Sequence, residues 1–460
     1  MTDRMSADAA DLPRLLDALR DTAMRGLAEL DERPAAVPPT PVRTIPLPHN
    51  GIGAHAALTD FQCHWEARLS GSAGPRYCGF VTGGTTPAAL AGDWLTTVYD
   101  QNAGVGGDSG APQLERQTAA WLAELFGLTG HTGVFVTGAT MSNLSGLALG
   151  RQWLGRQRGV NVAVDGATAL GEPTVLSATP HSSVVKAMSV LGMGRSALEY
   201  LPTVPGSESV DVAALGERLE QLGDRPVVVV ANAGTVNTGD FDDLAGIARL
   251  RDRYPFWWHV DAAFGGFAAV SPTTRHLTDG IAAADSVCVD LHKWLNVPYD
   301  AAMAFTSHDN LRTEVFGNNA AYLGEPGAEP DFLHLGPENS RRLRALPTWF
   351  TLRAYGRDGY RRLVERNIAA ARRLGDRLSR SPDARLTAPV RLNVVCFVPT
   401  RRSVPEVVDE VARTGTTFVT PTVMAGVPAV RAAFTNWRTD TEDVDAIGDA
   451  LEAALAAPRP

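Results

Sequence analysis

The central part of the chain, from about residue 110 to residue 310, alternates short apolar strands with helical stretches, and this alternation restricts the fold more than any other feature. The strands are continuously apolar, β-branched or aromatic, so neither face of the sheet is expected to meet water. A mostly parallel sheet covered by helices on both faces satisfies this pattern, which predicts an α/β protein. The candidate strands are 133–138, 173–178, 226–234, 256–261, 286–291 and 301–306.

The pattern changes on both sides of this central region. Residues 11–34 have helical periodicity with one apolar face, and a proline-rich connector follows as far as residue 48. After residue 341, two long helical stretches precede an alternating strand at 391–399, another helix and a last strand at 431–436. We therefore predict an N-terminal helical and extended segment over 1–108, a large domain over 109–340 and a smaller α+β C-terminal domain over 341–460.

Charge and composition argue against several classes of protein. The 460 residues carry a formal net charge of −9 without a basic stripe, so we expect no nucleic-acid partner. No apolar stretch approaches the roughly 20 residues that span a bilayer, and the N-terminus lacks the apolar core of a signal peptide, so we expect a cytoplasmic protein without a membrane partner. The four cysteines are scattered and predict neither a disulfide framework nor a cysteine-built metal site.

Lysine is almost absent from the sequence. Of the 42 Lys and Arg residues, only Lys186 and Lys293 are lysines. Arginine replaces lysine as a solvated charge, but it cannot supply the nucleophilic amine that forms a Schiff base. Lys293 follows an apolar strand and stands beside His292, where an amine can be desolvated and held rigidly, whereas Lys186 lies in a predicted helix. Lys293 is therefore the candidate nucleophile, and the alternative is an ordinary lysine on a loop at a strand end.

Asp261 ends the strand at 256–261 and is followed by alanines and glycines. Small residues beside a carboxylate make a slot for a planar ring with the acid at its edge. Asp261 precedes Lys293 by about one strand–helix–strand unit, so the two are expected at neighbouring strand ends, where open α/β sheets bind ligands. An N-cap and a metal ligand are the alternative roles for this aspartate.

Two further segments suggest ligand contacts. Residues 137–140 (TGAT) turn from a strand into a helix, and free N–H groups with small hydroxyl side chains at a helix start make a phosphate seat. The turn lacks the lysine and spacing of a nucleotide-binding Walker A loop. His181 follows the strand at 173–178, where an imidazole can stack on a flat cofactor and donate a proton, or serve only the structure.

Together these segments resemble the group II pyridoxal-phosphate (PLP)-dependent decarboxylases, the family of aromatic amino-acid, histidine and glutamate decarboxylases. The resemblance covers nearly the whole chain, and the ordered pair of HVDAA and HKW is its most specific part. The matching segments are GPRYCGF (74–80), SGAPQLE (109–115), TGATMSN (137–143), PHSSVVKA (180–187), NAGTVNTGDFDDL (232–244), HVDAAFGG (259–266), DLHKW (290–294), SRRLRALPTWFTLRAYGRDG (340–359) and FTNWRT (434–439).

The resemblance implies fold type I of the PLP-dependent transferases and a homodimer with active sites at the subunit interface. It implies that Lys293 forms the internal aldimine with PLP, and that Asp261 keeps the pyridine nitrogen protonated so that the ring withdraws electrons. His181 is expected to stack on the ring and act near the substrate. The amine of an L-amino acid would then displace Lys293, and CO2 would leave through a quinonoid intermediate.

The resemblance also implies which residues surround the cofactor. Ala263 is expected against the ring face opposite His181. Ala139 and Thr140 are expected to hold the phosphate with His292 nearby. Thr82 is expected near the substrate carboxylate.

The sequence departs from the family at three places. Asp290 stands where relatives often have asparagine, and because a carboxylate repels a phosphate, we expect it to point elsewhere or to meet a donor. Gly74 replaces a histidine. Phe332 stands where aromatic amino-acid decarboxylases have a tyrosine in a mobile loop, and Tyr322 lies earlier in the chain. In the family, phenylalanine at that place goes with decarboxylation coupled to oxidative deamination, so Phe332 is a candidate substrate residue.

Three functions therefore stay open. An amino-acid decarboxylase, a carboxy-lyase, is the leading one. The second is an aldehyde synthase, aminotransferase or lyase on the same fold. The third is a catalytically silent PLP-fold scaffold.

Overall fold

The computed structural model describes residues 3–42, 44–318 and 329–458. The strands of its main sheet are β1 (Thr132–Val136), β2 (Val175–Ser177), β3 (Leu198–Tyr200), β4 (Val227–Asn232), β5 (Phe256–Asp261), β6 (Ser286–Asp290) and β7 (Ala302–Thr306). They are ordered β1-β7-β6-β5-β4-β2-β3. β7 is antiparallel to β1 and β6, and the pairs from β6 across to β3 are parallel. The prediction of an α/β protein with a mostly parallel sheet is confirmed.

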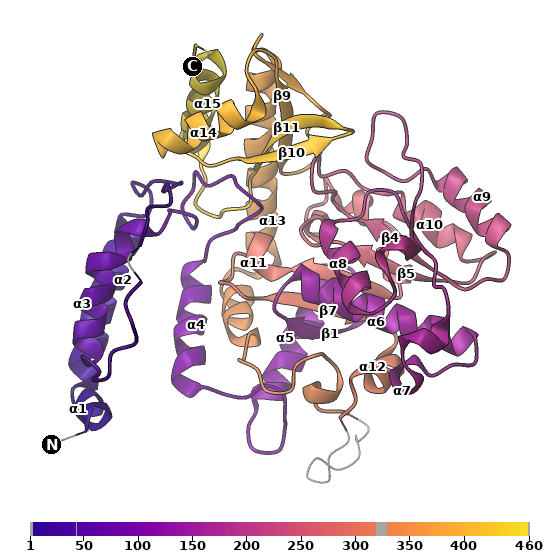
Figure 1. Cartoon of the computed structure of the whole chain (residues 1–460), viewed down its shortest axis with the longest axis horizontal. Helices are drawn as coiled ribbons and strands as arrows, with labels where there is room; N and C mark the ends of the chain where they lie inside the picture. The colour runs from indigo at the N-terminus through magenta and orange to yellow at the C-terminus, as the bar shows by residue number, and fades with distance from the viewer. Residues whose placement is uncertain (1–2, 43, 319–328, 459–460) are drawn as a thin grey trace.

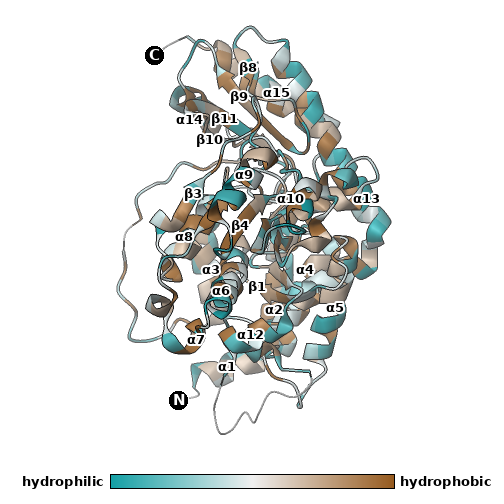
Figure 2. Cartoon of the chain, turned by 90° about the vertical axis from the view of Figure 1, so that its right-hand side faces the viewer, coloured by the Kyte–Doolittle hydropathy of each residue, from teal (hydrophilic) through white to brown (hydrophobic). Residues whose placement is uncertain are grey.

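The main sheet is buried on both faces because successive side chains of its strands enter two different cores. In β4, Val227 and Val229 belong to one core, and Val228 and Val230 belong to the other. Figure 2 shows hydrophobic colouring on the strands and hydrophilic colouring on the outer helical surfaces. The first core is covered by α5 (Ala111–Leu125), α9 (Val212–Leu222) and α10 (Leu244–Leu250), and the second by α6 (Ala139–Gln157), α8 (Ser182–Val190) and α12 (Asp309–Phe316).

The hydrophobic pattern predicts six of the seven strands of this sheet and misses β3. That strand has three residues, lies at the sheet edge and ends on the exposed Tyr200. A strand so short and so exposed leaves no apolar run in the sequence. Two short helices complete this part of the chain, α7 (Val162–Asp165) and α11 (Leu291–Trp294).

A second, four-stranded antiparallel sheet with its own apolar core follows in the chain. Its strands are β8 (Ala384–Leu386), β9 (Val394–Pro399), β10 (Thr420–Met424) and β11 (Val427–Ala433), in the order β10-β11-β9-β8. It lies at the end of the molecule that carries α14 (Val404–Thr414) and α15 (Thr441–Ala456) (Figure 1). The predicted strand 431–436 is placed too late, because a tight turn at Ala425 and Gly426 starts β11 earlier.

The helix α13 (Ala345–Ser379) connects the two sheets. Its backbone leaves the helical conformation at Gly356, where φ is 60°, so the two predicted helical stretches are two arms of one kinked element. The first arm packs on α5 and α4 (Pro87–Tyr99), and the second reaches β8, β9 and α15. The division of the chain at residues 108 and 340 stays a prediction.

The N-terminal helices α1 (Arg4–Ala10), α2 (Leu12–Ala28) and α3 (Ala54–His64) stand beside the main body (Figure 1). None of their residues is buried. Leu12, Leu16 and Leu19 of α2 are 46%, 52% and 43% exposed, so an apolar helix face is uncovered in the single chain. Within the described residues, no helix is both long and apolar enough to cross a membrane.

Candidate functional site

Five of the predicted site residues line a cavity of about 240 Å³ at the carboxyl ends of β4, β5 and β6: Ala139, His181, Asp261, Ala263 and Lys293. This is the edge at which the ends of parallel strands leave room for a ligand. The lining residues are Phe80, Val81, Ala139, Thr179, His181, Asn232, Gly234, Val236, Asp261, Ala263, Phe264, Lys293, Tyr299 and Arg431.

Lys293 lies in α11, which begins directly after β6, so the strand end holds the amine at the cavity. Its Nζ is 2.7 Å from Asp290 Oδ2. Burial lowers the pKa of Lys293, but the charge and hydrogen bond of Asp290, followed by the charge of Asp261, outweigh it and leave that pKa above its usual value. The structure therefore holds the free amine as an ammonium group.

Asp290 meets two donors rather than turning away from the cavity. Besides Lys293, the backbone N–H of Ala139 donates to Asp290 Oδ1 over 2.6 Å. Ala139 is the first residue of α6, where the sequence predicts a phosphate seat. Asp290 is 2% exposed, so its carboxylate lies buried at the start of α6.

Asp261 closes β5 and is 6% exposed. Its Oδ2 accepts a hydrogen bond of 2.8 Å from Asn143 Nδ2, and its Oδ1 accepts one of 3.1 Å from the backbone N–H of Ala263. Both oxygens are thus oriented by neutral donors, while the residue still lines the cavity. Of the small residues predicted to form a slot beside Asp261, Ala263 lines the cavity.

His181 caps the start of α8 and lines the same cavity. Its Nδ1 accepts the backbone N–H of Ser183 over 3.2 Å and lies 2.7 Å from Ser183 Oγ. Desolvation by the surrounding protein lowers the pKa of His181, an effect that the charge of Asp261 partly offsets. The imidazole is therefore neutral near pH 7, and the proton on its other nitrogen is available to a ligand.

The remaining predicted residues lie at different distances from the cavity. His292 is buried and stacks on Tyr299 with ring centroids 4.3 Å apart. Thr82 is buried beside the lining residue Val81, and its Oγ1 is 3.3 Å from Tyr299 Oη. Thr140 is exposed and does not line the cavity, in contrast to its neighbour Ala139.

Phe332 is not brought to this cavity. It lies in the short helix η7 (Phe332–His334), is 2% exposed and packs between the guanidinium groups of Arg116 and Arg341, 5.0 and 5.2 Å from its ring centre. It lines a different cavity, so the structure of the single chain does not support its assignment to the substrate. Tyr322 lies outside the described residues.

Sequence reasoning missed Arg431 and gave no role to Asn143. Arg431 comes from β11 of the second sheet, is 7% exposed and donates to the carbonyl oxygens of Val236 and Phe80 over 2.8 and 3.2 Å. In the sequence, Arg431 is a charged residue inside an apolar strand, and this does not reveal where the strand packs. Asn143 stood inside the matched segment TGATMSN, but its partner Asp261 is distant in sequence.

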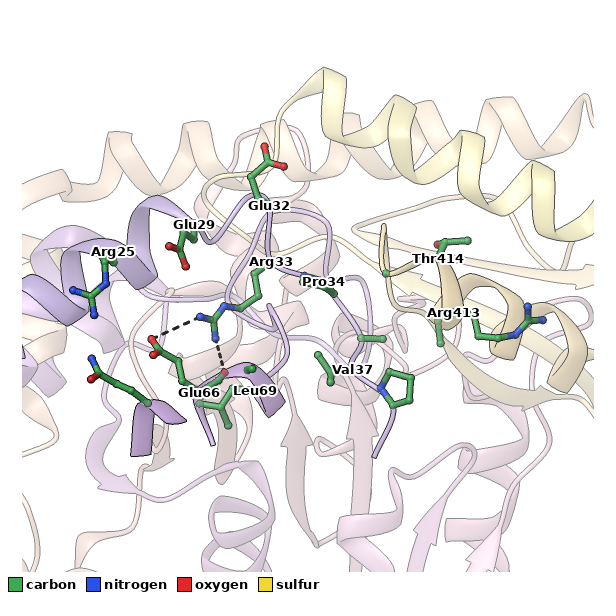
Figure 3. A pocket seen from close by; sticks show the side chains of 16 residues that line it. Arg25, Glu29, Glu32, Arg33, Pro34, Val37, Glu66, Leu69, Arg413 and Thr414 are labelled. Carbon is green, nitrogen blue, oxygen red and sulfur yellow. Dashed lines mark hydrogen bonds and ion pairs between the residues drawn. The ribbon is translucent and has the colours of Figure 1, made fainter. Parts of the chain in front are cut away.

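A larger hollow of about 780 Å³ lies between α2, the proline-rich connector and the end of α14 (Figure 3). Its lining mixes acidic and basic side chains, and Arg33 is already paired with Glu66. None of the lining residues is a lysine, histidine or cysteine. The chemistry of the side chains, not the size of the hollow, therefore selects the Lys293 cavity as the candidate site.

Comparison with known proteins identifies the family of the chain. Residues 58–399 match the family model described as the pyridoxal-dependent decarboxylase conserved domain. An aromatic-L-amino-acid decarboxylase of Bacillus atrophaeus is 27% identical over 390 residues, which are 80% of this chain and 79% of the relative. An L-2,4-diaminobutyrate decarboxylase of Acinetobacter baumannii is 31% identical over 313 residues, which are 64% of this chain and 60% of the relative.

The fold is similar to that of a solved plant protein. The crystal structure of Oryza sativa TDC with PLP and tryptamine superimposes with a TM-score of 0.89, covering 97% of this chain and 98% of that chain at 22% identity. At this identity the superposition supports the fold, and the fold is that of type I PLP enzymes.

Proposed function

This chain belongs to the pyridoxal-dependent decarboxylase family and is a PLP-dependent amino-acid decarboxylase, and we propose that its chemistry takes place in the Lys293 cavity. One observation carries the proposal: the amine of Lys293, the carboxylate of Asp261 and the first backbone N–H of α6 meet at one place at the strand ends. These groups come from β6–α11, β5 and α6, which are far apart in sequence.

The residues present fit PLP. Lys293 is the amine that would hold its carbonyl carbon, and Asp261 is the carboxylate that would face its ring nitrogen. Ala263 offers a small side chain against which a flat ring can lie, and Ala139 begins the helix that would face the phosphate. When bound, PLP supplies an electron-poor ring that accepts the electron pair of a bond broken at the substrate α-carbon.

The side chains of this protein would position the ring and the substrate and transfer protons. Asp261 would place its carboxylate beside the ring nitrogen and favour the protonated form of that nitrogen. His181, neutral near pH 7, would lie on the ring and place a proton near the reacting carbon. Lys293 would accept and return protons once the substrate amine has replaced it. Thr82 and Tyr299, which contact each other, would border the substrate carboxylate.

The opening of the cavity suggests which side chains the substrate carries. Phe80 and Tyr299 line it and are each 60% exposed, so two aromatic rings face an incoming ligand. We propose an L-amino acid with an aromatic side chain, which stacks on such rings. Arg431 makes an acidic side chain the second candidate, because it places a guanidinium group in the lining of the cavity.

We also propose that the protein is a cytoplasmic homodimer whose active sites lie at the subunit interface. Support comes from apolar side chains that the single chain leaves uncovered, on α2 and on α4, where Trp94, Val98 and Tyr99 are 44%, 71% and 64% exposed. A second copy of this chain is the partner that would cover such faces in a symmetric assembly.

The test is a product assay with the PLP-loaded enzyme. Aromatic, acidic and diamino L-amino acids are incubated separately, and CO2, amine, aldehyde, ammonia and hydrogen peroxide are measured. Equal amounts of CO2 and the matching amine are expected. Aldehyde with ammonia, peroxide and consumption of O2 would establish the aldehyde synthase instead. No product from any substrate, without a visible PLP band, would favour the silent scaffold.

A further inference from the structure

A line of buried hydrogen bonds runs from Asp261 away from the cavity into the second core. Asn143 donates to Asp261 over 2.8 Å, and Asn143 Oδ1 is 2.9 Å from His259 Nε2. His259 Nδ1 is 2.8 Å from Ser286 Oγ, which also accepts from Trp257 Nε1 over 3.2 Å. Asn143, His259 and Trp257 are fully buried, and Ser286 is 1% exposed. The line joins α6, β5 and β6 behind the candidate ring-binding carboxylate.

The chemistry of the groups fixes the direction of every bond in this line. Because Asp261 accepts the amide N–H of Asn143, the amide oxygen is free to accept and His259 must carry its proton on Nε2. His259 Nδ1 is then an acceptor, so Ser286 donates to it, and the indole of Trp257 can only donate to Ser286. Burial lowers the pKa of His259 to about 4, which keeps the imidazole in the neutral form that this arrangement needs. All donors therefore point toward Asp261.

The backbone is shaped to admit this line. A Cβ added to Gly146 of α6 would lie 2.5 Å from His259 Nδ1 and 3.0 Å from Ser286 Oγ. One added to Gly150 would lie 2.7 Å from a ring carbon of Trp257. Any side chain at these two positions would separate the helix from the strands, so the glycines let α6 bring Asn143 to Asp261.

Asn143 also connects Asp261 with His181. Its Nδ2 is 2.9 Å from Ser183 Oγ, and that hydroxyl is 2.7 Å from His181 Nδ1. One amide group thus orients both side chains that would contact the ring, one at its edge and one on its face. A change that tilts Asn143 is expected to disturb both.

We propose that Asn143 and His259 are positioning residues, and that the directed line from Trp257 to Asp261 sets the orientation and basicity of the carboxylate that faces the cofactor ring. The proposal rests on the role assigned above to Asp261. In a buried site, hydrogen bonds in series polarise one another, so each donor in the line adds to the stabilisation of the carboxylate charge. Weakening the line makes Asp261 more basic, draws the proton away from the ring nitrogen and leaves the ring less able to withdraw electrons.

The experiment follows the visible absorption band of PLP bound to the purified holoenzyme as a function of pH. His259→Phe retains an aromatic ring but removes both hydrogen bonds of the imidazole. His259→Gln retains an N–H donor near the position of Nε2. Trp257→Phe removes only the most distant donor. His131→Phe is the matched control, because His131 is 7% exposed, hydrogen-bonded to the backbone of Ala284 and outside the line.

His259→Phe is expected to move the pH midpoint of the band upward by about half a unit to one unit, the size of one lost hydrogen bond between two neutral groups, here His259 and the Asn143 amide. The midpoint rises because a less electron-poor ring makes the nitrogen that links Lys293 to PLP more basic. Trp257→Phe is expected to give a smaller shift in the same direction, His259→Gln a midpoint close to wild type, and His131→Phe no shift. If His259→Phe does not fold, the other two variants still test the proposal, because Trp257→Phe should have a higher midpoint than His259→Gln.

Equal midpoints in His259→Phe, Trp257→Phe and His131→Phe would overturn the proposal. Asp261→Asn separates this failure from that of the proposed function. A band that Asp261→Asn leaves unchanged would refute the role of Asp261 itself. A band that changes in Asp261→Asn but not in the other variants would refute only the line of hydrogen bonds.

Discussion

The ammonium group of Lys293 lies 2.7 Å from Asp290 Oδ2. The same carboxylate accepts the backbone N–H that begins α6, so it joins the candidate nucleophile to the candidate phosphate seat. Asp290 therefore holds a proton on Lys293 and a negative charge where a phosphate would bind, and both effects oppose loading with PLP.

Asp290→Asn is expected to speed the incorporation of PLP into the apoenzyme at pH 7.5 by about tenfold, the effect of one pKa unit on the amine. Without the carboxylate, burial dominates and the pKa of Lys293 falls, so the pH midpoint of incorporation also moves down. The growth of the visible PLP band measures both. Asp93→Asn removes the same charge at the surface ion pair with Arg342 and should change neither. An unchanged rate in Asp290→Asn would contradict the role given to Asp290.

Lys293→Arg is expected to lower kcat by at least about 10³-fold, as removal of an essential nucleophile does. Arginine keeps the positive charge but cannot form the covalent link, so borohydride reduction followed by mass spectrometry should find no PLP attached to the chain. Lys186→Arg changes the only other lysine and should retain both activity and attachment. Attachment of PLP at Lys186 in the wild type would refute the assignment.

The stability of the protein should fall as the pH drops from about 6.5 toward 4. His259 is buried with a pKa lowered to about 4, so in this range the unfolded chain binds a proton there that the folded chain does not. The His259 contribution has a slope of about 1.4 kcal/mol per pH unit. Urea unfolding of wild type and His259→Gln between pH 5 and 6.5 measures it, because the variant lacks the titrating ring. Parallel pH profiles for the two proteins would show that His259 does not titrate as described.

Arg341→Met should destabilise the protein by about 3–5 kcal/mol, because it leaves a buried carboxylate without its partner. Arg341 and Glu115 form a two-pronged ion pair of 2.8 and 2.5 Å, with side chains 2% and 0% exposed. Adding Glu115→Gln removes the unpaired charge and is expected to recover much of the loss in thermal or urea unfolding. Equal stability of the single and double variants would argue against this reading.

Leu16→Glu should weaken a homodimer that is held together through the apolar face of α2. Leu16 is 52% exposed in the single chain, and burying a charge there in an interface carries a large desolvation free energy. Light scattering should then find a larger fraction of monomer at low concentration. Arg14→Glu, whose side chain is 86% exposed on the same helix, is the control and should leave the mass unchanged. A dimer equally stable in both variants would place the interface elsewhere.

Local patterns in the sequence predict the strand ends that carry Asp261 and Lys293, because Asp261 ends one mostly apolar run and Lys293 follows shortly after another. They do not predict Arg431, which reaches the cavity from a different sheet and shows no local sign of its destination. The contacts of Phe332 are not predicted for a related reason. Counting along a loop gives only its place in the sequence. The packing of its ring depends on Arg116, which is distant in sequence, and on Arg341, which follows the loop.

The start of α6 and the amide of Asn143 belong to the same rigid element, and this limits how the site can be redesigned. Ala139 and Asn143 are about one helical turn apart, so the backbone itself sets the spacing between the candidate phosphate seat and the amide that donates to Asp261. A cofactor analogue with a longer phosphate arm would have to displace a helix whose glycine face is already in contact with β5 and β6. Enlarging the cavity by side-chain substitution would not accommodate such an analogue, whereas changes at the substrate end leave this spacing intact.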